Sequence, residues 1–161
     1  MISSWIRFFA DMIQRIQSIY LLLAFVCLLL MNFWPIASFG PAIVNLQGVV
    51  SQSDIALEPI LDLQYSYLQL PLMLLTLITI FLFKDRKKQM LLARLDYLLV
   101  LAFIVWMQID LGRFSEQSGE GIQVSYDIST FLPVIALAFL LLAHRAIKKD
   151  EELVRSLDRL R

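Results

Sequence analysis

The side chains that could bind a metal are mainly carboxylates, and most of these lie outside the long apolar stretches. Three carboxylates, Asp54, Glu58 and Asp62, are spaced four residues apart, so a helix would place them on one face. Such a stripe could hold a divalent cation through oxygen ligands. Pro59 interrupts that helix, and an acidic surface in water accounts for the same residues. We therefore expect no metal site and no bound cofactor.

The residues that could act as nucleophiles or bases are isolated. His144 adjoins Arg145, and no serine or cysteine is placed beside it as a nucleophile. Cys27, the only cysteine, lies within an apolar stretch, where we expect it to pack as a small apolar side chain. One cysteine excludes an internal disulfide, and one histidine leaves too few ligands for a closed zinc site. We expect a protein that is not an enzyme.

The composition points to a membrane as the solvent. The 161 residues are 59% hydrophobic and 17% charged, with a mean hydropathy of +0.72, whereas soluble domains are about 45–50% apolar and about 25% charged. Fourteen basic and fourteen acidic residues give no net charge, so no overall basic field attracts nucleic acid. Disorder and a purely soluble enzyme are excluded.

Four apolar stretches account for most of the hydrophobic residues. A span needs about 20 residues, because each residue rises about 1.5 Å through a hydrocarbon layer of about 30 Å. The third and fourth stretches reach this length only with their amphipathic ends. We predict an all-α integral membrane protein, a bundle of four transmembrane helices in a single membrane domain over residues 1–161. The predicted spans are 18–36, 67–84, 90–111 and 129–147.

The basic residues predict the orientation of these spans. All fourteen except Arg113 fall on the side of both termini and of the connection between the second and third spans. Lysine and arginine accumulate in cytoplasmic segments, so both termini should be cytoplasmic. The segments 37–66 and 112–128 are then external loops.

The N-terminal residues have two alternative interpretations. A cleaved signal peptide would use Arg7 and Arg15 as its basic region, but the apolar run is long and no small-residue cleavage site follows it. Retention as a span is preferred. Residues 1–11 then resemble an amphipathic interfacial extension, and Met12 is an alternative start of translation.

Polar residues are sparse in the predicted spans. Asn32 should find a partner on a neighbouring helix, and Thr76 and Thr79 are candidates for close packing between helices. No ionisable residue falls in the middle of a span, which disfavours a transporter. Four polar residues fall near the ends of the third span, where we expect them at the membrane interface: Arg94, Asp96, Gln108 and Asp110.

The external loops carry strand patterns. Ile122, Val124, Tyr126 and Ile128 alternate with polar residues, and residues 42–50 are rich in β-branched side chains. These patterns predict a small sheet joining the two loops. A pair of irregular loops is the alternative.

The C-terminal tail, residues 148–161, has the spacing of an amphipathic helix. Leu153, Val154, Leu157 and Leu160 recur at helical intervals, so the fourth span should continue as a cytoplasmic helix. Its apolar strip could lie on lipid headgroups, cover the basic connection or meet another protein. A solvated extension without a partner is the alternative.

Three segments resemble those of a known family: MIQRIQSIYLLLA (12–24), FKDRKKQMLLARL (83–95) and LPVIALAFLLLAHRAIKKDEELVRSLDRLR (132–161). The chain is similar to an uncharacterised family of small four-span bacterial inner-membrane proteins, defined by a domain of unknown function. The resemblance implies a start at Met12 and a periplasmic location for the external loops. It implies no catalytic residue.

These observations favour a non-enzymatic accessory or scaffold subunit of a membrane assembly. The alternative is a small transporter or lipid-handling protein. The expected partners are the lipid bilayer and either another membrane protein or a second copy of the chain. The residues expected to bind anionic lipid or an acidic partner are Lys84, Arg86, Lys87, Lys88, Arg145, Lys148, Lys149, Arg155, Arg159 and Arg161.

Overall fold

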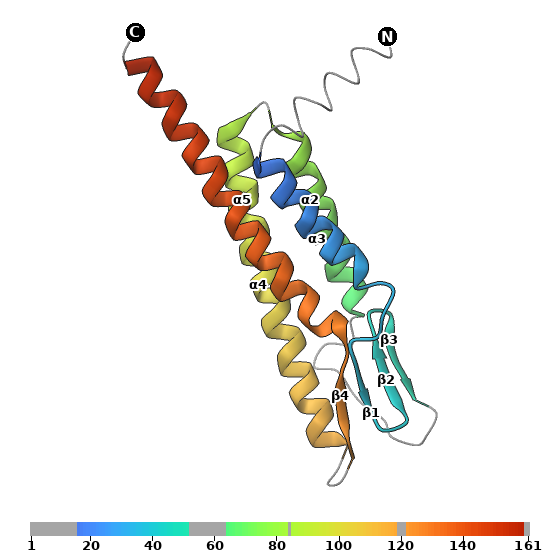
Figure 1. The fold of residues 1–161 in the computed structure, drawn as a ribbon. Helices are drawn as coiled ribbons and strands as arrows, with labels where there is room; N and C mark the ends of the chain where they lie inside the picture. The colour runs from blue at the N-terminus through green and yellow to red at the C-terminus, as the bar shows by residue number, and fades with distance from the viewer. Residues whose placement is uncertain (1–15, 52–63, 84, 119–121, 160–161) are drawn as a thin grey trace, which may run out of the picture.

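The described residues form four helices that stand side by side, with a small sheet at one end of the bundle (Figure 1). The computed structural model describes residues 16–51, 64–83, 85–118 and 122–159. Helices α2 and α4 each pack against both α3 and α5. A mostly helical bundle with a small sheet is therefore confirmed. The helices are α2 (Ile16–Leu30), α3 (Tyr65–Phe81), α4 (Arg86–Gln117) and α5 (Ile128–Arg159).

The interior of the bundle follows a seven-residue repeat. On α4 the buried positions recur at alternating steps of four and three residues from Gln89 to Phe114, and α2 and α3 repeat the pattern. Such spacing is typical of helices that cross at about 20° and interlock their side chains. Ala24, Ala136 and Ala143 are fully buried, and their small size allows close approach of the helices.

The outward faces of the helices are apolar along most of their length. Leu74 and Val105 are 57% and 50% exposed, and many other leucine, isoleucine and phenylalanine side chains are similarly open. Polar side chains of the same helices are buried instead: Gln17, Gln69, Thr76, Thr79, Gln89, Asp96 and Asp110. A soluble bundle has the opposite arrangement, with its polar residues outside.

Two helices have the length and composition to cross a membrane: α4 and the Ile128–Glu152 part of α5. Helices α2 and α3 are apolar but shorter. Two boundaries differ from the predicted ones by six residues: α2 ends at Leu30 rather than at 36, and α4 ends at Gln117 rather than at 111. Pro35 follows the end of α2 closely and disfavours helix before it.

Asn32 lies in the turn that follows the end of α2. Its side-chain amide donates a hydrogen bond to the Leu29 carbonyl oxygen at 2.9 Å. The predicted contact with a neighbouring helix is therefore wrong, because α2 has already ended and the amide bonds to its own last turn. The chain passes from here directly into the sheet.

The sheet joins the two predicted external loops, as expected. Its antiparallel strands have the order β3-β2-β1-β4, and the pairing of Ser38 with Ser125 connects the loops. Phe39 packs edge-on against Phe114 of α4, with ring centroids 6.1 Å apart, so the sheet is fixed to the bundle. The strands are β1 (Ala37–Phe39), β2 (Ala42–Asn45), β3 (Gly48–Ser51) and β4 (Val124–Tyr126).

Two tight turns separate strands that the residue pattern did not resolve. Residues 42–50 form a hairpin rather than one strand, and Gly48 adopts a φ of 132° where the chain reverses. Gly40, with a φ of 58°, turns β1 into β2. Both values favour glycine, since larger residues rarely adopt them.

Helix α5 continues without interruption into the C-terminal tail. It extends to Arg159, and its last turns project beyond the end of the bundle opposite the sheet (Figure 1). The predicted helical continuation is confirmed over these residues. The extension at residues 1–11 and the acidic stripe at 54–62 lie outside the described residues.

Candidate functional site

Helix α4 presents a line of polar side chains to α3. Gln89, Asp96 and Asp110 are separated by seven and fourteen residues, so they share one face of the helix. All three are fully buried. Phe103 occupies the position on this face halfway between Asp96 and Asp110. We call Gln89, Asp96 and Asp110 the α4 polar line.

Asp96 lies inside the bundle, in contact with α3. Its Oδ2 is 2.8 Å from Thr76 Oγ1, and its Oδ1 has no hydrogen-bond partner among the described residues. Asp96 is buried against α3, whereas Arg94 is exposed. That both lie near the membrane interface stays a prediction. Because α4 begins at Arg86, Asp96 lies about 15 Å further along the helix.

Asp110 occupies the other end of the line and is also buried within the bundle. The Tyr65 hydroxyl of α3 donates a hydrogen bond to Asp110 Oδ2 at 3.3 Å. The Tyr65 ring packs against Trp106, with centroids 5.0 Å apart. Gln108, in contrast, is exposed. The packing of α4 on α3 buries one face of α4, which carries Asp110 but not Gln108.

Two glutamine side chains add hydrogen bonds between helices. Gln89 Nε2 donates to the Thr79 carbonyl oxygen of α3 at 3.2 Å. Gln69 Nε2 of α3 donates to the Leu28 carbonyl oxygen of α2. Thr79 donates only within its own helix, to the Leu75 carbonyl oxygen. Both predicted threonines are buried, but Thr76 is the one whose hydroxyl contacts another helix.

The sequence contained a pattern that would have located these residues. The heptad spacing of Gln89, Asp96 and Asp110 marks one helix face, and Gln69 and Thr76 are also seven residues apart. Hydrophobic periodicity could not reveal this face, because the opposite face is equally apolar. In such a helix the polar residues identify the buried side.

The described members of the predicted basic set lie at the start of α4 and in the later part of α5, toward the end of the bundle opposite the sheet (Figure 1). Arg86 is half-buried at the start of α4. Lys84 and Arg161 are outside the described residues, and Arg155 and Arg159 are placed only by their backbone in α5. The exposed members are Lys87, Lys88, Arg145, Lys148 and Lys149.

The ion pairs recorded for these basic residues are exposed and weak. Lys88 Nζ lies 2.9 Å from Asp85, and Lys148 Nζ lies 3.9 Å from Glu152. Exposed pairs of this kind contribute about 0–1 kcal/mol. The lysines can therefore exchange these partners for others at little cost.

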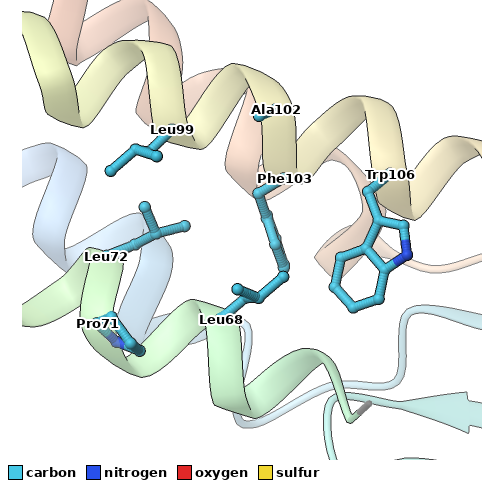
Figure 2. A pocket seen from close by; sticks show the side chains of 7 residues that line it. All are labelled: Leu68, Pro71, Leu72, Leu99, Ala102, Phe103 and Trp106. Atoms are coloured by element: carbon cyan, nitrogen blue, oxygen red, sulfur yellow. The ribbon is translucent and has the colours of Figure 1, made fainter. Parts of the chain in front are cut away.

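An apolar groove lies on the outer surface between α3 and α4. Figure 2 shows Leu68, Pro71 and Leu72 of α3 opposite Leu99, Phe103 and Trp106 of α4. The groove has a volume of about 390 Å³. Its lining side chains are of the same kind as the apolar exterior around it, so it suits an apolar occupant.

Comparison with known proteins relates most of the chain to a family without adding a function. No curated protein and no solved structure matches the chain. A family match covers residues 13–160, which include all four helices up to Arg159 and the sheet. The expected resemblance to a family of unknown function is thereby confirmed. The chain belongs to the family described as Domain of unknown function (DUF4293).

Proposed function

We propose that this protein is embedded in a membrane through its four helices. The observation that carries the proposal is the inverted polarity of the bundle, with leucines outside and Gln69, Gln89, Asp96 and Asp110 inside. In water, the exposed apolar surface would cost free energy, whereas lipid tails solvate it. Polar groups in lipid must instead find partners inside the protein.

The orientation we propose places the basic end in the cytoplasm of a bacterial cell and the sheet in the periplasm. Lys87, Lys88, Lys148 and Lys149 are exposed at the basic end. Arg113 is exposed near the sheet, at the other end of α4. This distribution follows the rule that basic residues remain on the cytoplasmic side.

The role we propose is that of a non-enzymatic accessory or scaffold subunit of an inner-membrane assembly. The hydrogen bonds of the polar core fasten helices to one another: Thr76 to Asp96, Tyr65 to Asp110 and Gln89 to Thr79. The basic end and the projecting α5 are then the polar surfaces open to partners. Each well-placed basic residue contributes about 1 kcal/mol toward an anionic membrane surface.

Removal of residues 148–161 tests the scaffold role. The full chain and the truncated chain are purified from membranes in a mild detergent, and the size of each complex is measured. A neutralised variant, K148Q with K149Q, separates the contribution of charge from that of the helix. We expect the truncated chain to lose its associated protein while remaining in the membrane fraction. An unchanged complex size after truncation would exclude the tail as the assembly surface.

A small transporter or lipid-handling protein is the second candidate, favoured by the α3–α4 groove and by the buried Asp96. The two candidates differ at Gln69, which is fully buried and bonds to α2. A packed scaffold keeps a cysteine at that position (Gln69→Cys) unreactive toward a small water-soluble thiol reagent. A transport cavity would make the same cysteine reactive.

A further inference from the structure

We propose that Asp96 is a proton-binding site inside the bundle and that Gln89 and Gln17 line the route by which the proton arrives from the basic end. This inference goes beyond the scaffold role and does not depend on any partner. It rests on the hydrogen-bond geometry at Asp96 and on the buried polar atoms between Asp96 and the basic end of the bundle.

The surroundings of Asp96 hold no positive charge that would balance a carboxylate. Within the part of the chain that the structure describes, no lysine, arginine or histidine forms an ion pair with it. A buried carboxylate without a positively charged partner costs so much free energy that it takes up a proton instead. The neutral carboxylic acid is therefore the form that fits this site.

The hydrogen-bond geometry of Thr76 agrees with a protonated Asp96. Thr76 Oγ1 lies 2.9 Å from the Leu72 carbonyl oxygen and 2.8 Å from Asp96 Oδ2. A hydroxyl has a single hydrogen to donate. An ionised Asp96 would have to share that one hydrogen with the Leu72 carbonyl oxygen. A protonated Asp96 allows two full hydrogen bonds, because Thr76 donates to Leu72 and the carboxylic acid donates to Thr76.

None of the described titratable groups on the neighbouring elements forms an ion pair with Asp96, so the protonated form of Asp96 still fits the site. On α5, His144 packs against Tyr97, the residue after Asp96, with ring centroids 5.7 Å apart. Arg94, on α4 itself, is exposed. The described part of α3 carries only the titratable hydroxyls of Tyr65 and Tyr67, and that of α2 carries only Tyr20 and Cys27.

Buried polar atoms mark a route from the basic end to Asp96. Gln89 lies two turns before Asp96 on the same helix face, and its Oε1 has no partner among the described residues. The Gln17 amide of α2 is also buried, and both of its polar atoms are likewise without a described partner. Such atoms are the partners that an internal water molecule requires.

Gln17 and Gln89 lie at the same depth in the bundle. The hydrogen bond from Gln69 to Leu28 fixes the level of α3 against that of antiparallel α2. The same number of residues counted back along α2 from Leu28 and forward along α3 from Gln69 places Gln17 level with the end of α3. At that level the Thr79 carbonyl oxygen accepts the hydrogen bond of Gln89. The two amides therefore form a polar layer between the basic end and Asp96.

Infrared spectroscopy of the full chain at neutral pH tests the site. The wild type should show the carbonyl stretching band of a protonated carboxylic acid. D96N should abolish this band, whereas D110N should retain it. If D96N does not fold, T76V provides the test, because loss of the hydrogen bond should shift the frequency of the band. A spectrum in which D96N removes only carboxylate bands, or in which T76V shifts nothing, would overturn the assignment.

Transfer to heavy water tests the route, because deuteration shifts the same band. We expect Q89L to slow the exchange of the Asp96 proton several-fold. The matched control is Q108L, on the exposed side of the same helix, which should exchange at the wild-type rate. Equal rates in Q89L and wild type would exclude the route through Gln89. Neither result depends on membrane orientation or on a partner, so each remains distinguishable from failure of the scaffold proposal.

Discussion

Two buried threonines on α3 form a natural comparison at the scale of single residues. The Thr76 hydroxyl contacts Asp96 on α4, whereas the Thr79 hydroxyl bonds only to the Leu75 carbonyl oxygen of its own helix. We predict that T76V lowers the free energy of unfolding by about 1 kcal/mol, the size of a hydrogen bond between membrane helices.

T79V serves as the control, since the change of shape and polarity is the same but no contact between helices is lost. Unfolding is measured in mixed detergent micelles by the loss of helical circular dichroism. Equal destabilisation by the two substitutions would show that the contact between Thr76 and Asp96 contributes nothing to stability.

Tyr65 offers a second test at this scale. Y65F removes the hydroxyl that donates to Asp110 and keeps the ring against Trp106. We expect a loss of about 0.5–1.5 kcal/mol in unfolding free energy, the size of one intramolecular hydrogen bond. Y67F, at a ring that is 59% exposed, should leave stability unchanged. The same unfolding assay applies, and wild-type stability of Y65F would contradict the prediction.

At the scale of elements, the close packing of α5 depends on small buried residues. Ala136 is fully buried, and Ala138 on the same helix is exposed. We predict that A136L destabilises the bundle by about 1–3 kcal/mol through overpacking. A138L adds the same atoms on the outer face and should have little effect. Thermal unfolding in detergent compares them, and a stable A136L protein would argue against tight packing there.

The sequence allowed the helices and the sheet to be predicted, because each depends on local patterns. Long apolar runs indicated the helices, and the alternation around Val124 and Tyr126 indicated β4. Strand β1 was missed, because Ala37–Phe39 is too short for alternation to show. Gly40 and Gly48 were the available turn signals.

The buried carboxylates could not be predicted by the same means. The third span was expected over 90–111, which placed Asp96 and Asp110 near its ends, but α4 extends over Arg86–Gln117 and packs this face on α3. A helix that is apolar on every side gives no periodic contrast, so hydropathy alone does not show which side faces its neighbours. The heptad spacing of the polar residues shows which side of the helix is buried.

At the scale of the whole molecule, charge and polarity separate along the bundle axis. The exposed lysines Lys88 and Lys149 lie at one end and the sheet with Ser125 lies at the other, joined by helices with apolar outer faces. The basic end could be predicted from the sequence alone, because the connections between apolar runs determine which charges share a side.

The most direct measurement of the proposed membrane embedding is thiol labelling in intact cells. Cys27 is replaced by alanine, and single cysteines are introduced as S125C, K88C and K149C, all at exposed positions. A thiol reagent that cannot cross the inner membrane should label S125C in intact cells and should label K88C and K149C only after that membrane is opened. Labelling of K88C or K149C in intact cells, or protection of S125C, would contradict the account.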